Sequence, residues 1–180
     1  TYTDKVSGMK VTATVKVLPA FNSVDWVLDF TNTSKTNNSP QVNGIKVVDL
    51  DLQYPDSGEY RLHYADGSHV SRADFHPRLK VMNPGENHSM APQGGRSSQV
   101  AFPFFNIESP SKQGVMVASG WTGTWFADIV RSSDKSIRLA TGMTYIDTYL
   151  QPAETIRTPS TNQLFWQGED RLAGHNRVRQ

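Results

Sequence analysis

The chain has 180 residues and a formal net charge of +1, with 37% hydrophobic and 19% charged residues. This length suits one domain with a sizeable core, and the composition excludes a disordered chain. No apolar run approaches the roughly 20 residues that a membrane-spanning helix needs, and before the last ten residues there is no basic cluster of the kind that binds nucleic acid. The absence of cysteine excludes disulfides, zinc–thiolate sites and cysteine nucleophiles, but it fits a bacterial periplasmic or secreted protein as well as a cytoplasmic one.

Apolar and polar residues alternate along most of the chain with a period of two, not 3.6. Such alternation predicts antiparallel strands that have one buried side and one side in solvent. The clearest segments are Lys10–Val17 and Val24–Thr31. Further strands are expected at Val48–Leu52, Tyr60–Tyr64, Leu79–Val81, Val115–Ser119, Trp125–Val130, Ile137–Ala140, Met143–Leu150 and Leu164–Trp166.

Turn-forming residues separate these segments. Asp66-Gly67 predicts a hairpin turn and Asn83-Pro84-Gly85 a second turn, while Thr31–Asn43 and Gly85–Ser98 have the polar, glycine-rich composition of loops. About ten short strands with turn signals between them indicate an all-β, antiparallel β-sandwich.

The composition changes at Gly168, where strand-forming residues give way to a basic segment that is compatible with a helix. We therefore expect a sandwich domain over residues 1–167 and a linker to a further domain over residues 168–180. The chain starts at Thr1 instead of Met, and Arg171 to Gln180 contains no stop signal. We expect the chain to be a fragment of a longer protein.

The sequence contains few patterns that predict catalysis or metal binding. The five histidines include no H-x-x-x-H pair, so solvated or hydrogen-bonded histidines are favoured over a metal site. No G-x-S-x-G elbow is present, and Gly94-Gly95-Arg96-Ser97-Ser98 lacks the spacing and the following helix of a phosphate loop. No cofactor is expected.

Carboxylates matter because glycosidases use a pair of them about 5–9 Å apart. The candidates are Asp49, Asp51, Asp74, Asp128, Asp147 and Glu154. Asp49 and Asp51 are expected on the solvated side of one strand, and sequence spacing pairs none of the others. No catalytic role is assigned to any of them.

Two tryptophans, Trp121 and Trp125, are four residues apart and would share one side of a regular strand. An indole can stack on the apolar face of a sugar ring. Gly123 lies between them and would allow a backbone or a ligand to approach closely. The alternative is that at least one of the two tryptophans belongs to the core.

An ordered series of segments resembles a known family. The series comprises Tyr2-Thr3-Asp4, Gly8-Met9-Lys10-Val11, Asp25-Trp26-Val27-Leu28-Asp29-Phe30-Thr31-Asn32-Thr33, Asp74-Phe75-His76-Pro77, Gly94-Gly95-Arg96-Ser97-Ser98, Phe102-Pro103-Phe104-Phe105-Asn106, Gly120-Trp121-Thr122-Gly123-Thr124-Trp125, Leu150-Gln151-Pro152-Ala153-Glu154-Thr155-Ile156-Arg157-Thr158-Pro159 and His175-Asn176-Arg177. It resembles the N-terminal domain of α-galactosidases (melibiases) of glycoside hydrolase family 36. Pro152-Ala153-Glu154 departs from the family's Pro-Gly-Glu at a turn.

The resemblance implies a β-supersandwich that precedes a catalytic (β/α)₈ barrel. In the family the barrel carries both catalytic aspartates of a retaining mechanism, and no residue of this chain matches them. The chain alone is therefore expected to be inactive and to act on terminal α-galactosides only within the full-length enzyme. Arg96, Trp121 and Trp125 are the candidate substrate-binding residues at the rim of the barrel's active site. A structural role for Arg96, in a salt bridge or as a cap of carbonyls, is the alternative.

Two other functions remain open at this stage. The chain could be a free-standing carbohydrate-binding module in which Trp121 and Trp125 bind sugar unaided, or an interaction domain that builds a homo-oligomer. Neither a nucleic acid nor a membrane is an expected partner.

Overall fold

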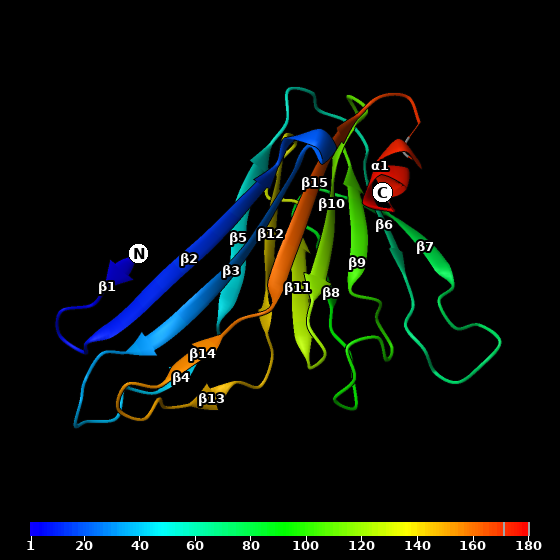
Figure 1. Ribbon diagram of the computed structural model, residues 1–180. Helices are drawn as coiled ribbons and strands as arrows, with labels where there is room; N and C mark the ends of the chain where they lie inside the picture. Colours follow the sequence, from blue (N-terminus) through cyan, green and yellow to red (C-terminus); the bar gives the residue numbers. More distant parts are fainter. Residues whose placement is uncertain (171, 180) are drawn as a thin grey trace.

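The computed structural model describes residues 1–170 and 172–179, so Arg171 and Gln180, the ends of the predicted basic segment, lie outside the described residues. The fold is nearly all β, with two antiparallel sheets that face each other (Figure 1). The predicted antiparallel sandwich is confirmed. No helix in the described part of the chain is long and apolar enough to cross a membrane.

The large sheet has nine strands in the order β1-β2-β3-β15-β10-β9-β6-β7, and β14 pairs separately with β3. Their bounds are β1 Tyr2–Thr3, β2 Met9–Leu18, β3 Ser23–Asn32, β6 Tyr60–Ala65, β7 Pro77–Met82, β9 Phe104–Glu108, β10 Gln113–Gly120, β14 Thr155–Arg157 and β15 Ser160–Gln167. The small sheet has only four strands, in the order β5-β12-β11-β8. These are β5 Lys46–Gln53, β8 Asn87–Met90, β11 Trp125–Val130 and β12 Ser136–Met143.

Three short elements complete the chain. A two-stranded ribbon joins β4 (Val42–Asn43) to β13 (Asp147–Thr148), and a 3₁₀ helix, η1 (Pro19–Phe21), connects β2 to β3. The only α-helix of the described residues, α1 (Leu172–Val178), lies within the segment predicted to be compatible with a helix.

The core lies between the two sheets and follows the predicted alternation. Leu62, Ile107 and Val117 of the large sheet and Ile129 and Leu139 of the small sheet are completely buried in one cluster. Each of these side chains alternates along its strand with a residue that points away from the cluster. Full burial of one aliphatic side chain stabilises the fold by roughly 1.5–3 kcal/mol, so this cluster is the main source of stability.

The opposite face of the large sheet carries a smaller cluster beneath α1. Met116, Leu164 and Trp166 are buried there. The helix approaches them closely at Gly174, where a Cβ atom would lie 2.8 Å from Trp166 Cδ1. A residue with a side chain at this position would push the helix away from the sheet.

Several sequence predictions about local structure are wrong, including the loop expected at Thr31–Asn43, which contains β4. Met143–Leu150 was expected to be a strand, but β12 ends at Met143 and only Asp147–Thr148 pair again. Gly85–Ser98 was expected to be a loop, yet it contains β8. A hairpin turn at Asp66-Gly67 was expected, whereas an eleven-residue loop, 66–76, joins β6 to β7, because Gly67 packs against the backbone of a second loop instead of reversing the chain.

Arg131 links three inter-strand connections at one end of the sandwich: β5–β6, β7–β8 and its own β11–β12 connection. Its guanidinium donates to the carbonyls of Met82 (2.7 Å) and Gly58 (2.9 Å) and lies 4.7 Å from the ring centre of Tyr60. Only 5% of the residue is exposed. Its loss would leave buried carbonyl oxygens without donors, which is costly.

We predict that Arg131→Met lowers the free energy of unfolding by about 2–4 kcal/mol. The matched variant Arg138→Met removes an exposed ion pair with Asp49 and should cost less than about 1 kcal/mol. Urea denaturation of both variants measures the difference, and equal costs would contradict the role given to Arg131.

Candidate functional site

Two loops lock together at one end of the sandwich, where the predicted rim residues lie. Loop 66–76 and the segment that follows β8 share backbone hydrogen bonds, from Gly67 N to Val100 O (2.8 Å) and from Ser68 N to Ser98 O (2.7 Å). A Cβ atom on Gly67 would collide with the Ser98 carbonyl oxygen. Glycine at this position is what allows the two loops to approach each other.

Asp74 organises the first of these loops. Its carboxylate accepts hydrogen bonds from Ser68 Oγ (2.7 Å) and from the backbone N–H groups of His69 (2.7 Å) and Ser71 (3.0 Å). These bonds, that of Ser68 first, hold the pKa of Asp74 well below its usual range. The charged carboxylate therefore fixes a loop that contains two non-glycine residues with positive φ, Val70 and Phe75.

Trp125 belongs to the core and not to the molecular surface. It is completely buried, and its Nε1 donates to the carbonyl of Ser97 at 2.7 Å. A sugar has no access to this indole in the structure. The bond instead holds the loop next to Arg96 against the first residue of β11.

Trp121 lies outside β11, so the prediction that the two tryptophans share one strand side is wrong. It follows the end of β10 and is half-buried. A Cβ atom on Gly123 would lie 2.7 Å from Trp121 Nε1. The space left by this glycine is therefore occupied by the Trp121 indole itself.

Arg96 is exposed, and its Nε donates to Gln99 Oε1 at 3.2 Å. Within residues 1–170 and 172–179 it forms no ion pair. Of the three predicted site residues, Arg96 and Trp121 are thus accessible to a partner and Trp125 is not.

The predicted carboxylates are each engaged locally. Arg138 and Lys46 lower the pKa of Asp49 to about 2, while Asp128 accepts from Ser89. Asp147 accepts from Gln41 and Glu154 from the backbone of Gln151. No group of three or more His, Cys, Asp or Glu side chains in the described part of the chain could hold a metal ion.

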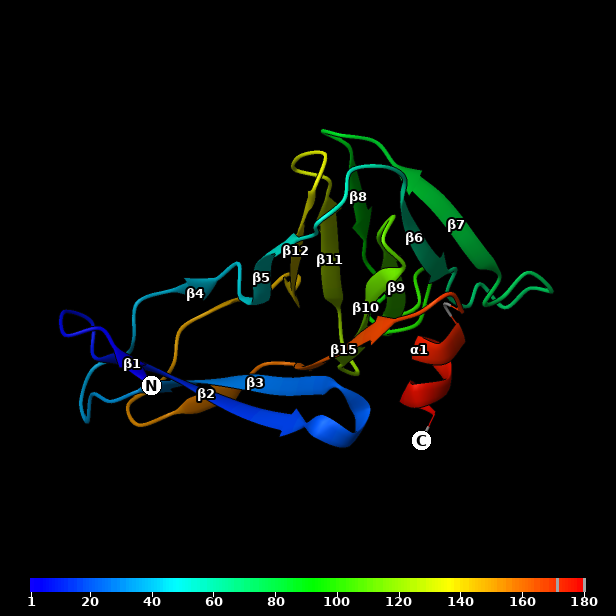
Figure 2. The same ribbon diagram turned by 90° about the horizontal axis from the view of Figure 1, so that it is seen from above.

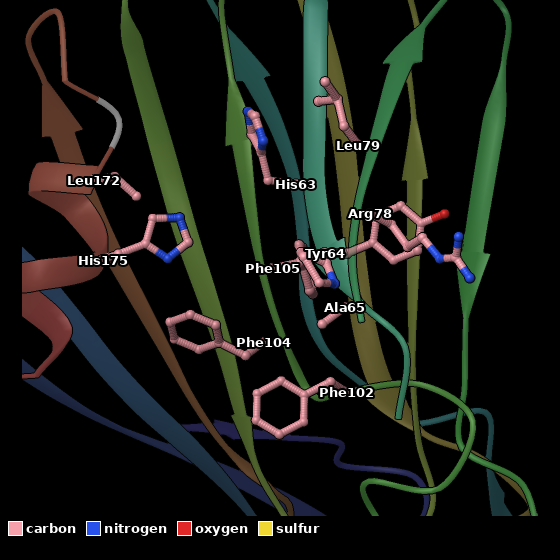
Figure 3. Close-up of a pocket in the computed structure, with 11 residues that line it drawn as sticks. His63, Tyr64, Ala65, Arg78, Leu79, Phe102, Phe104, Phe105, Leu172 and His175 are labelled. Atoms are coloured by element: carbon pink, nitrogen blue, oxygen red, sulfur yellow. The ribbon is translucent and has the colours of Figure 1, made fainter. Parts of the chain in front are cut away.

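A groove of about 400 Å³, which the sequence did not predict, opens on the outer face of the large sheet beside α1 (Figure 3). Figure 3 shows His63 from β6, Phe104 from β9 and His175 from α1 around it. The rings of Phe104 and His175 are 6.1 Å apart, edge to face. The remaining walls are mostly apolar and include Leu79, Phe102 and Leu172.

His63, which lines this groove, forms a buried pair with Glu108. His63 Nε2 is 2.7 Å from Glu108 Oε2, and the two side chains are only 12% and 8% exposed. Lys112 Nζ lies 3.6 Å from the other carboxylate oxygen. The prediction that the histidines are solvated or hydrogen-bonded is confirmed for His63.

Asn106, which pairs with His63 across β9 and β6, is a second buried polar residue close to the groove. Its Oδ1 accepts from Trp166 Nε1 at 2.8 Å. The side chain is completely buried, and its Nδ2 has no hydrogen-bond partner among the described residues. The outer face of the sheet therefore combines apolar walls with polar groups that are shielded from water.

The fold matches part of several solved enzymes. An α-galactosidase from Lactobacillus brevis matches 99% of this chain with a TM-score of 0.78 and 20% identity. The chain has the fold of one part of this α-galactosidase. Two α-galactosidases of glycoside hydrolase family 36 from Geobacillus stearothermophilus, AgaA and AgaB, match 92% and 96% of the chain, with TM-scores of 0.75 and 0.76 and identities of 16% and 17%.

In each case the chain spans only 23% of the length of the α-galactosidase that it matches. Substituted variants of AgaA have been solved in complex with stachyose and with raffinose. No protein-family model and no curated protein matches the chain. The sequence resemblance to these α-galactosidases is thus confirmed at the level of the fold.

We predict that the charged Asp74 carboxylate stabilises loop 66–76 above about pH 4 and that this stabilisation is lost in acid. The folded pKa lies below the unfolded value of about 3.9, so the stabilisation is complete above the unfolded value and is lost as the pH falls through the folded one. Hydrogen exchange of residues 66–76, relative to intrinsic rates, should accelerate in acid. At pH 7 the exchange rate of this loop should rise several-fold in Asp74→Asn. It should not change in Asp56→Asn, which removes an exposed carboxylate from another loop and serves as the control. An exchange rate in Asp74→Asn equal to that of the wild-type chain would contradict this role.

Proposed function

We propose that the chain is the N-terminal, non-catalytic β-sandwich domain of an α-galactosidase-like glycoside hydrolase that cleaves terminal α-galactosides. In this proposal residues 1–167 form the sandwich, and residues 168–180 lead towards a catalytic (β/α)₈ barrel. The proposal rests on one observation. Between 92% and 99% of the chain matches a part of three α-galactosidases that makes up 23% of the length of each of them. The parent enzyme acts on carbohydrate, and this domain supports it.

The groove beside α1 is a suitable surface for the barrel to pack against. Leu79 and Leu172 beside it are 57% and 50% exposed, which is unusual for large apolar side chains clustered at one place. A covering domain would bury them and would further shield the His63–Glu108 pair. Contact with α1 would also place the barrel directly after the chain's last helix.

The locked loops suit a role at the mouth of the active site. Arg96 is exposed on a segment whose backbone is fixed by Trp125 through Ser97, and Trp121 offers part of its indole to solvent. Such a rim could hold the outer sugars of an oligosaccharide while the barrel performs hydrolysis. The candidate carboxylates of this chain are held by local hydrogen bonds, which supports leaving the bond cleavage to the barrel.

A free-standing carbohydrate-binding module is the weaker alternative. That function would need a platform of exposed aromatic rings, and burial of Trp125 leaves Trp121 as the single indole of the predicted pair. One half-buried indole offers a small stacking surface.

We predict that the purified 180-residue chain does not hydrolyse an aryl α-galactoside. The proposed parent enzyme, in which a barrel follows the sandwich, should hydrolyse it. Calorimetry with raffinose should detect no binding by the isolated chain at a Kd of about 1 mM or below. Trp121→Ala should leave this result unchanged.

Turnover by the isolated chain would overturn the proposal. Binding at a Kd of about 1 mM or tighter that is lost in Trp121→Ala, but kept in Phe165→Ala, would favour the carbohydrate-binding module. Phe165 is a suitable control because it is 43% exposed on a strand remote in sequence from the Trp121 turn.

A further inference from the structure

Three polar side chains are buried in the sandwich without a hydrogen-bond partner for one of their atoms. The atoms are the hydroxyl oxygens of Thr141 and Thr161 and the amide nitrogen Nε2 of Gln163, none of which has a partner among the described residues. The three residues are only 1–2% exposed. Native proteins leave very few buried polar atoms unpaired, because the hydrogen bonds lost to water are then not replaced. Three such groups in one core therefore indicate a missing partner.

Two of these groups are neighbours on β15 of the large sheet. Thr161 pairs with Trp26 of β3, and Gln163 pairs with Val117 of β10. Val117 belongs to the core between the sheets and Trp26 packs against it, and directly paired residues point to the same side of a sheet. Thr161 and Gln163 are two positions apart along β15, so both side chains point inward, towards the small sheet.

The third group lies on the strand of the small sheet that faces β15. Trp26 Nε1 donates to the carbonyl of Val47 at 2.9 Å, which places β3 opposite β5. The next strand is β15 in the large sheet and β12 in the small sheet, and the two layers keep this order in Figure 2. Thr141 of β12 pairs with Val48, a core residue directly after Val47. Thr141 therefore faces Thr161 across the core.

The inner positions beside the two threonines carry small side chains. Ser119 pairs with Thr161 in the large sheet, and Ala127 pairs with Thr141 in the small sheet. Facing sheets are about 10 Å apart, a distance that short side chains on both sheets do not span. This part of the core thus combines unpaired polar atoms with space for a small molecule between the sheets.

We propose that Thr141, Thr161 and Gln163 form a binding site for an internal water molecule that links the two sheets. The water accepts hydrogen bonds from Gln163 Nε2 and from the Thr161 hydroxyl, and it donates one to the hydroxyl oxygen of Thr141. A hydroxyl group donates and accepts, whereas an amide nitrogen only donates, so the three groups use both capacities of water. About three hydrogen bonds to otherwise unpaired groups are usual for a buried water molecule.

Water fits this interlayer site better than a metal ion or a segment of another domain. The three groups and their neighbours Ser119 and Ala127 are uncharged, so they would not balance the charge of a cation, which prefers carboxylate ligands. Side chains of the chain itself already bury the three groups. A domain packed on the outside of the sandwich would therefore not supply their hydrogen-bond partners.

Isosteric substitution separates a bridged site from unpaired groups by the sign of its effect on stability. Thr141→Val and Thr161→Val each keep the shape of the side chain and remove one hydroxyl. If water joins the site, each variant leaves the remaining groups unmet, and the equilibrium constant for unfolding should rise by about tenfold. The control Thr14→Val lies on the exposed outer side of β2, next to Val15, which pairs with Trp26. It should change this constant less than about twofold.

The double variant Thr141→Val/Thr161→Val tests whether the two hydroxyl groups share one water molecule. Removal of the first hydroxyl already breaks the bridge, so removal of the second should have little further effect. The unfolding constant should therefore rise by much less than the product of the two single effects, as expected for groups in one hydrogen-bonded network. Urea denaturation of the wild-type chain and the four variants gives all of these constants.

Oxygen-17 relaxation dispersion of the solvent supplies a readout of the water itself. It detects water molecules that stay bound while the protein tumbles, and exchange of hydroxyl protons does not affect it. The wild-type chain and Thr14→Val should show a contribution from long-lived water that the double variant lacks.

A folded Thr141→Val or Thr161→Val chain that is more stable than the wild type would overturn the proposal, because removal of a truly unpaired hydroxyl relieves a cost. Multiplying effects in the double variant would show independent groups and would overturn it as well. So would equal long-lived water in the wild type and the double variant, since any coupling would then come from a direct hydrogen bond between the threonines. These assays use the 180-residue chain alone, so their outcome is independent of the proposed link to α-galactosidases.

Discussion

Burial of alternate side chains between the large and the small sheet holds every other feature of this protein in place. Leu62, Ile107 and Val117 supply one side of this contact, and Ile129 and Leu139 supply the other. Because the small sheet has four strands and the large sheet nine, the contact covers only part of the large sheet. The two locked loops lie at one end of this central core, and the groove lies on the outer face of the large sheet.

Polar interactions take over at those boundaries. Arg131 connects three segments at one end, and at the other end the buried Asn32 amide donates to the carbonyls of Leu150 (3.0 Å) and Gln151 (3.1 Å). Asp74 orders loop 66–76, and the His63–Glu108 pair lies beside the groove. In this account the core provides stability, and the polar periphery positions the surfaces proposed above for a catalytic domain and a sugar.

The sequence predicted the fold class and the long strands because alternation is a local signal. It missed β8, where His88 and Met90 point inward between polar residues, and β9, where the polar side chains of Asn106 and Glu108 are buried although they break the expected apolar pattern. The groove could not be predicted, since it depends on the register that places His63 opposite Asn106. Burial of Trp125 was one of two open alternatives, and only the packing of the loop around Ser97 decided between them.

The most direct test of the central claim is the unfolding free energy of two matched variants, Val117→Ala and Val15→Ala. Both valines lie on the inner side of the large sheet, but Val117 is completely buried and Val15 is 55% exposed. The account predicts a loss of about 2 kcal/mol or more for Val117→Ala and less than about 0.5 kcal/mol for Val15→Ala. Equal losses would contradict a single core confined to the space between the two sheets.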